Sequence, residues 1–116
     1  HVAIALTTNT STITAIGNDY GFVHIFERQI KSLCREGDIA IGMSTSGLSE
    51  NVIRGLMAAR SKGAKCIALT GRRTKEMNKV ADLTVKVPST STPRIQECHL
   101  MIGHIVYELV GKMMKR

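Results

Sequence analysis

The stretch that decides the fold reads Ile39-Ala40-Ile41-Gly42-Met43-Ser44-Thr45-Ser46-Gly47-Leu48-Ser49-Glu50-Asn51-Val52. Its first five residues are apolar and predict a buried strand, whereas its last three open a helical pattern. A turn rich in hydroxyl groups, residues 44–49, lies between them. Ligands of parallel sheets bind beyond the carboxyl ends of the strands, so this turn is predicted to hold a ligand.

Four short apolar runs predict the strands of the sheet. None of them alternates cleanly between apolar and polar residues, which is typical of strands covered on both faces. The runs are Val2–Leu6, Asp38–Met43, Lys65–Thr70 and Leu83–Val87. Helical patterns separate the runs, so the sequence predicts an α/β fold, namely a three-layer, doubly wound parallel sheet.

Three amphipathic patterns predict helices. The first has its apolar stripe at Phe22, Phe26, Ile30 and Leu33. The second covers residues 52–59 and has Gly63 as its C-terminal cap. The third is predicted to have Thr92 as N-cap and Pro93 as its first helical residue. Its apolar face is broader than one sheet needs, which predicts packing against another subunit.

The chain has 116 residues, which suit one domain over residues 1–116. The predicted strand Val2–Leu6 begins almost at the first residue, which suggests that the N-terminal helices and the first strand of the domain are missing from this chain. No apolar run approaches the ~20 residues of a membrane-spanning helix, and no signal peptide is visible. We therefore expect a cytoplasmic protein without a membrane partner.

The cysteines and the charges indicate neither a disulfide-bonded or metal-binding protein nor a nucleic-acid-binding one. Cys34, Cys66 and Cys98 form no C-x-x-C pair and lie beside apolar residues, which predicts buried, reduced thiols. The net charge of +7 is scattered along the chain. Because no aromatic residues lie among these charges to stack on bases, they favour solvated helix faces over a nucleic-acid groove.

The hydroxyl-rich turn has the chemistry of a phosphate site. Its four hydroxyl donors are Ser44, Thr45, Ser46 and Ser49. Gly47 lets the backbone approach a ligand closely, and the following helix adds free N–H groups and the positive end of its dipole. A simpler interpretation is that Ser49 only caps the helix, but this leaves three hydroxyls unexplained. No lysine follows the turn, as a nucleoside triphosphate loop would require.

A strand, then Ser-Thr-Ser-Gly-x-Ser, then a helix resembles the phosphate loop of sugar isomerase (SIS) domains. Further motifs narrow the resemblance: Ala15–Phe22, Val87–Ser89, Arg94–His99 and the later His104. Together they are similar to the phosphoheptose isomerases, and the resemblance extends over essentially the whole chain.

The resemblance implies an isomerase that converts sedoheptulose 7-phosphate to D-glycero-D-manno-heptose 7-phosphate through an enediol, on the route to ADP-heptose and the lipopolysaccharide core. The residues that it implies for binding the phosphate and the sugar are Ser44, Thr45, Ser46, Ser49, Asn18, Asp19 and Gln96. It makes His104 the catalytic acid or base and makes Gln96 and His104 ligands of a zinc ion. It also implies a homotetramer with active sites at its interfaces.

One segment of the family is missing from this sequence: an Asn-Gly-Gly-Ser turn and a helix with a histidine and a catalytic glutamate. Half of the acid–base pair and two zinc ligands are therefore expected to be absent, and this chain alone is expected to be inactive. Gln96 and His104 are ~12 Å apart along a continuous helix. Both residues can bind one metal ion only if the helix begins near Gln96 or if their long side chains converge. Otherwise, they serve sites that are shared between subunits. His99 is expected to pack in the core or an interface, and His24 to be structural.

Two other functions remain open. A non-enzymatic SIS protein that binds the replication initiator has a similar sequence, but its position matching His104 is typically not histidine. A sugar-phosphate sensor domain of a transcription regulator would need a DNA-binding part before the first residue. His104 therefore favours the isomerase.

Overall fold

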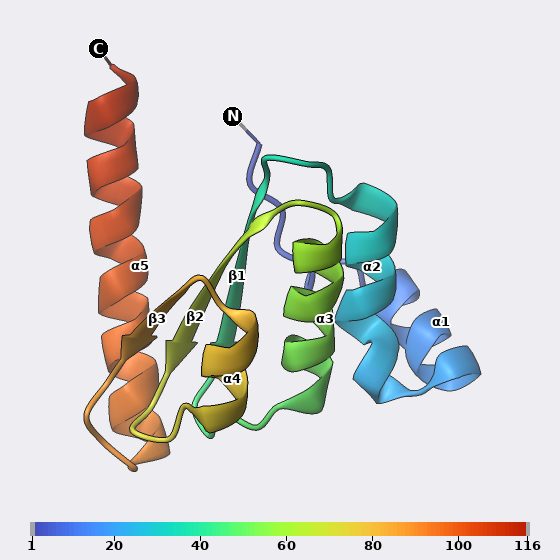
Figure 1. The fold of residues 1–116 in the computed structure, drawn as a ribbon, viewed down its shortest axis with the longest axis horizontal. Helices are drawn as coiled ribbons and strands as arrows, with labels where there is room; N and C mark the ends of the chain where they lie inside the picture. Colours follow the sequence, from blue (N-terminus) through green and yellow to red (C-terminus); the bar gives the residue numbers. More distant parts are fainter. Residues whose placement is uncertain (1, 116) are drawn as a thin grey trace.

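The structure is a computed structural model that describes residues 2–115 (Figure 1). Along the chain, helices alternate with three short strands. The elements are α1 (Thr10–Tyr20), the short 3-10 helix η1 (Phe22–His24), α2 (Ile25–Leu33), β1 (Ile39–Ser44), α3 (Glu50–Ser61), β2 (Lys65–Thr70), α4 (Lys75–Val80), β3 (Leu83–Lys86) and α5 (Thr92–Met114).

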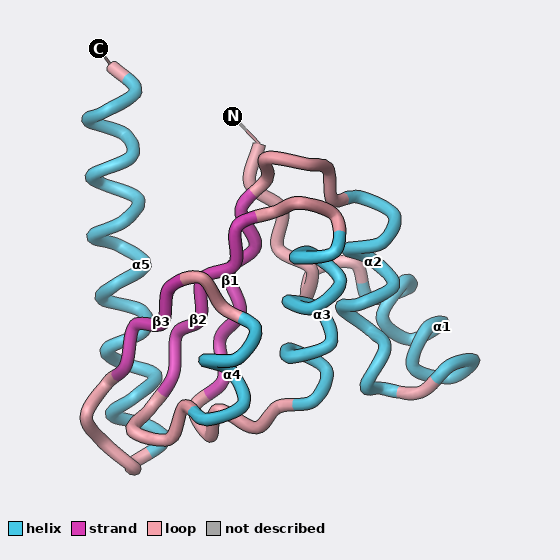
Figure 2. Tube along the Cα trace, in the orientation of Figure 1, coloured by secondary structure: helices cyan, strands magenta, loops and turns pink. Residues whose placement is uncertain are grey.

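The strands form one parallel sheet in the order β1-β2-β3 (Figure 2). Their register places Ser44 opposite Thr70, and Thr70 opposite Lys86. The strands therefore end at the same edge of the sheet, and the turns that follow them lie together there. The predicted parallel α/β sheet is confirmed.

Helices cover the sheet on both sides, so the predicted three-layer arrangement is confirmed as well. On one face, Leu56 of α3 and Met77 of α4 pack on Cys66 and Ala68 of β2 and form the core. On the other face lies α5, which runs back from the carboxyl edge of the sheet and extends beyond it (Figure 1). Helix α2 packs against α3, with α1 outside it.

The predicted strand Val2–Leu6 is wrong. These residues pair with none of the described strands, and the side chains of Val2 and Ile4 are 88 % and 61 % exposed. An extended run becomes a strand only when a neighbouring strand satisfies its backbone groups. Here the segment is tied to α2 instead, because the buried Gln29 donates from Nε2 to the carbonyl oxygen of Leu6 at 2.9 Å.

The other predicted elements are present with small shifts. β2 has the predicted bounds, β1 begins and ends one residue later, and β3 ends one residue earlier. The last helix begins at Thr92, so its N-cap is Ser91 rather than Thr92, and Pro93 lies in the first turn. The residues of α3 end at Ser61, and Gly63 follows with a positive φ of 83°, as expected of a C-terminal cap.

The predicted stripe over residues 22–33 is only partly correct. The 3-10 helix η1 interrupts the pattern, so the residues that α2 buries are Ile25 and Gln29, whereas Phe22 and Leu33 are exposed. Helices α1 and α4 were not predicted.

The cysteines are all free, as expected, but Cys66 alone is fully buried. Burial raises the pKa of its thiol.

Two apolar surfaces remain exposed on the part of the chain that the structure describes. On β1, alternate side chains are more than half exposed: Ile39, Ile41 and Met43. On α5 from Met101 onward, the exposed large apolar residues are Met101, Ile105, Val106, Tyr107, Leu109, Val110, Met113 and Met114. None of the helices over residues 2–115 is long and apolar enough to cross a membrane.

Candidate functional site

The hydroxyl groups of the turn after β1 are directed toward one another. Ser44 is buried, and its Oγ lies 2.7 Å from the Oγ of Ser49 and accepts the N–H of Ser49 at 3.3 Å. The Oγ of Ser46 lies 3.4 Å from that of Ser44 and accepts the N–H of Leu48 at 3.2 Å. Three of the four predicted hydroxyl donors therefore form one connected group.

The interpretation of Ser49 as a simple helix cap does not describe this turn. Ser49 occupies the N-cap position of α3, but its side chain makes no capping hydrogen bond. By contrast, Asn9 caps α1 by accepting the N–H of Thr12 at 3.0 Å. The Ser49 hydroxyl is turned toward Ser44, and the N–H of Val52 donates to Asn51 Oδ1 at 2.9 Å. The N–H groups of Glu50 and Asn51 in the first turn of α3 are therefore left for another acceptor. Such groups, at the positive end of a helix dipole, suit an anion.

Gly47 allows the turn to pack against the loop that follows β2. Its φ is +70°, and a Cβ at this position would lie 2.2 Å from the carbonyl oxygen of Arg73. Any side chain would therefore clash with backbone as well as strain the turn. The close packing fixes the turn against the neighbouring strand end.

An open hollow of about 550 Å³ lies between this turn and α5. It is lined by Met43, Ser44, Thr45, Ser49, Gln96, His99, Leu100, Gly103 and His104. The helix begins at Thr92, about one turn before Gln96, and is continuous through His104. Both residues line the same hollow. The structure thus brings the hydroxyl-rich turn, residues 44–49, and the polar side chains of α5 to one place.

The remaining predicted residues lie elsewhere. Ser46 is exposed within the turn but does not line the hollow. Asn18 and Asp19 are exposed on α1, where Asn18 Nδ2 donates to Asp19 Oδ1 at 3.0 Å. Figure 1 shows α1 and α5 at opposite ends of the molecule. Within one copy of the chain, Asn18 and Asp19 therefore do not meet Gln96 and His104.

Sequence reasoning gave no role at the site to His99, which the structure places in the lining of the hollow. It is buried, and its Nε2 lies 3.0 Å from the carbonyl oxygen of Thr70 at the end of β2. These two residues are 29 positions apart, so no local pattern could have indicated the contact. The one available indication in the sequence was its spacing of three residues from Gln96, which places the two side chains near the same face of a helix.

The described residues do not complete a zinc site. Among the described residues, no cluster of three or more His, Cys, Asp or Glu side chains is placed to hold a metal. Gln96 and His104 offer two donors, whereas a catalytic zinc ion takes three protein ligands and a water or substrate.

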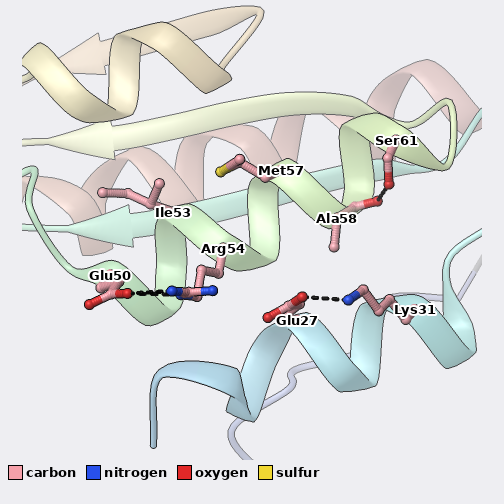
Figure 3. Close-up of a pocket in the computed structure, with 8 residues that line it drawn as sticks. All are labelled: Glu27, Lys31, Glu50, Ile53, Arg54, Met57, Ala58 and Ser61. Atoms are coloured by element: carbon pink, nitrogen blue, oxygen red, sulfur yellow. Dashed lines mark hydrogen bonds and ion pairs between the residues drawn. The ribbon is translucent and has the colours of Figure 1, made fainter.

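A second hollow, of about 490 Å³, lies between α2 and α3 (Figure 3). Its charged side chains already have partners: Glu27 pairs with Lys31, and Glu50 with Arg54 at 2.7 Å. Hydrogen bonds from Lys31 and His24 lower the pKa of Glu27 to about 2. His24, with Nδ1 2.7 Å from Glu27, thus has the structural role expected of it. The ion pairs of this hollow are local ones, between residues three or four positions apart.

The sequence can also be compared with those of known protein families. The family model for the SIS domain matches residues 1–71, more than half of the chain. The chain therefore belongs to the SIS-domain family.

Within that family, the curated relatives that it resembles are phosphoheptose isomerases. The protein from Aquifex aeolicus is 59 % identical over 111 residues, which are 96 % of this chain and 58 % of the relative. The protein from Burkholderia pseudomallei strain K96243 is 53 % identical over 108 residues, 93 % of this chain and 55 % of the relative. The chain thus spans a little more than half the length of the curated relatives it matches.

Solved structures give the same relationship. A phosphoheptose isomerase from Neisseria gonorrhoeae superposes with a TM-score of 0.93 at 44 % identity, over 96 % of this chain and 62 % of that one. A phosphoheptose isomerase from Francisella tularensis superposes with a TM-score of 0.89 at 40 % identity, over 93 % and 58 %. Both the backbone and the sequence are therefore similar to those of solved phosphoheptose isomerases.

Proposed function

We propose that the complete protein is an aldose–ketose isomerase that converts sedoheptulose 7-phosphate to D-glycero-D-manno-heptose 7-phosphate. The observation that carries this proposal is the single hollow in which Ser44 and Ser49 face Gln96 and His104. The names of the similar proteins support only the substrate class, a heptose phosphate. The proposal includes a cytoplasmic enzyme whose product leads toward ADP-heptose and lipopolysaccharide cores.

In this proposal the turn after β1 holds the phosphate at one end of the sugar. The hydroxyls of Ser44, Thr45 and Ser49, together with the first N–H groups of α3, donate hydrogen bonds to it. The other end of the sugar then lies against α5. Holding the phosphate with neutral donors fixes the substrate without placing a competing positive charge near the reacting carbons.

At the reacting end, a proton leaves C1 of the ketose to give a 1,2-enediol, and a proton returns at C2 to give the aldose. His104 acts as acid or base in this exchange, since imidazole changes charge near neutral pH. The described lining of the hollow contains no carboxylate. The second group of the acid–base pair therefore comes from outside this lining, either from another part of the complete protein or from a neighbouring subunit.

We include zinc in the proposal only as a partial site. Gln96 and His104 would supply two of its ligands, and the others would come from outside the described lining of the hollow. When bound, the ion would polarise the sugar oxygens.

The exposed apolar face of α5 supports a homo-oligomer, a tetramer by family resemblance. A contiguous apolar surface on a helix that extends beyond its own sheet is typical of subunit packing. Such packing would also let Asn18 and Asp19 reach the site of a neighbouring subunit. Light scattering of the complete protein tests this, and an Ile105→Glu variant should reduce the assembled mass.

The isomerase is tested by assaying sedoheptulose 7-phosphate conversion with the complete protein, with and without a chelator. His104→Asn should abolish turnover and leave binding of inorganic phosphate unchanged, because the phosphate turn lies on β1 and α3. His24→Asn, which alters a histidine outside the hollow, is the matched control. Turnover retained by His104→Asn would contradict the role of His104. Sugar-phosphate binding by the wild type without turnover would favour the sensor alternative.

A further inference from the structure

The carbonyl oxygen of Thr70 accepts two hydrogen bonds at the end of β2. The N–H of Val87 reaches it at 3.0 Å, and Nε2 of His99 reaches it at 3.0 Å. A carbonyl oxygen can only accept, so the Nε2 of His99 carries the hydrogen. The contact fixes both the tautomer and the direction of the imidazole ring.

Other parts of the site meet immediately beyond this contact. A Cβ on Gly71 would lie 2.5 Å from Ile95 Cδ1, 2.7 Å from the carbonyl oxygen of Thr45 and 3.1 Å from that of Ser89. The phosphate turn, the loop after β3 and the first turns of α5 therefore all approach the end of β2.

Two residues hold α5 against the rest of the molecule. Over its 23 residues, the buried ones are Ile95 and His99. The contact of Ile95 is apolar and therefore non-directional, whereas that of His99 is a hydrogen bond with a preferred angle. Rotation of α5 about its axis is consequently limited by His99.

Gln96 precedes His99 by three residues and His104 follows it by five, and all three line the same hollow. A change in the rotation of α5 would displace both of the other side chains relative to the phosphate turn. On β1, Ser44 would stay where it is, because the sheet holds it.

We propose that His99 is a positioning residue for the isomerisation, an inference that rests on the function proposed above. Its Nε2–H bond to Thr70 sets the rotation of α5 so that Gln96 and His104 face the substrate held by the phosphate turn. His99 itself takes no part in the proton transfer.

The test compares two variants of the complete protein. His99→Leu keeps a side chain of similar volume but removes the hydrogen-bond donor. His99→Gln retains an N–H donor at a similar distance from the backbone. Misplacement of reacting groups by about 1 Å costs up to ~100-fold in rate. We therefore expect His99→Leu to lower kcat at least about tenfold with KM changed less than about threefold, and His99→Gln to recover most of the kcat.

Cys66→Ala is the matched control for lost stability, because Cys66 is buried in the core on the same strand but far along it from Thr70. It should lower Tm and leave kcat unchanged. Full kcat in His99→Leu would overturn the proposal. A kcat in His99→Gln as low as in His99→Leu, or an equal loss in Cys66→Ala, would overturn it too.

A measurement without turnover separates this proposal from the proposed function. Nitrogen-15 NMR of the wild-type imidazoles should show His99 protonated at Nε2, with a proton protected from exchange by its bond to Thr70. Protonation at Nδ1, or rapid exchange at Nε2, would overturn the positioning role even in an active enzyme. If the wild type fails to turn over, the function is wrong, while a protected Nε2 proton would still support the placement of α5 by His99.

Discussion

The side-chain oxygens of Ser44 and Ser49 lie 2.7 Å apart, although Ser49 stands at the N-cap position of α3. The Ser49 hydroxyl, which the sequence alone could assign to the helix as a cap, belongs instead to the hydroxyl group of the turn after β1. Stability of the helix and affinity of the site should therefore respond separately to substitution.

We expect Ser49→Ala to weaken phosphate binding with little change in stability. Loss of one hydrogen bond to a charged group is worth about 1.5–3 kcal/mol, so KM for the sugar phosphate should rise about tenfold or more. Asn9→Ala is the contrasting variant, because it removes a true cap and should lower the free energy of unfolding by ~1 kcal/mol. Urea unfolding and steady-state kinetics measure the two effects; a large stability loss in Ser49→Ala would contradict this separation.

Gly71→Ala should damage both the fold and the site. Its Cβ would press on the carbonyl oxygen of Thr45 and on Ile95, and overpacking of this kind costs about 1–3 kcal/mol. Displacement of Thr45 should also weaken binding of inorganic phosphate, which calorimetry measures. Gly17→Ala is the control, since nothing lies within 4 Å of its Cβ position and alanine stabilises a helix interior by ~0.5–1 kcal/mol. Equal stability of the two variants would contradict the crowding at Gly71.

Stability should fall in acid as Glu27 becomes protonated. Its pKa is about 2 in the folded protein against 4.5 as a reference, chiefly because of the hydrogen bond from Lys31. A carboxyl whose pKa is lowered by folding stabilises the protein above its unfolded pKa and loses this effect as pH falls through the folded pKa. The loss therefore spans roughly pH 4.5 to 2.

Glu27→Gln should remove that contribution, about 1–2 kcal/mol at neutral pH, and flatten the stability profile over the same interval. Glu76→Gln is the control, because Glu76 forms an exposed pair with Lys79, and such pairs contribute little. The free energy of unfolding, measured for the three proteins at pH values from 7 to 2, tests this prediction. Parallel profiles for Glu27→Gln and the wild type would refute the assignment.

Leu56→Ala should be strongly destabilising, because Leu56 is buried in the core cluster with Cys66 and Met77. Large-to-small substitutions at such positions cost about 2–5 kcal/mol. Leu83→Ala on β3 removes the same atoms from a side chain that is 56 % exposed, so its effect on Tm should be much smaller. Similar Tm values for the two variants would contradict the position of the core.

Local patterns predicted the parts of the fold that depend on local chemistry. The bounds of β2 and the turn after β1 were correct because an apolar run and a hydroxyl cluster are contiguous in sequence. The strand Val2–Leu6 was wrong because a strand requires a partner, which an apolar run does not specify. Helix α1 escaped prediction because threonine and glycine within it have weak helix propensity, and α4 because six residues give little periodicity.

The same distinction applies to the site. The hydroxyls of the turn could be predicted together, whereas the shared hollow of Gln96 and His104 depends on how α5 lies against the sheet. The bond between His99 and Thr70 joins distant positions and left no pattern in the sequence. Asn18 and Asp19 show the converse, since their motif gave no indication that α1 lies far from α5.

Ser44 is both the last residue of β1 and the innermost hydroxyl of the turn. Alternate residues of a strand point to opposite faces, so a shift of one position turns every side chain over. A single-residue deletion or insertion within β1 would consequently direct this hydroxyl away from Ser49. Ile39 or Ile41 can be exchanged for another aliphatic residue without this effect. The number of residues in β1, by contrast, must stay constant, because it decides on which side of the sheet the Ser44 hydroxyl lies.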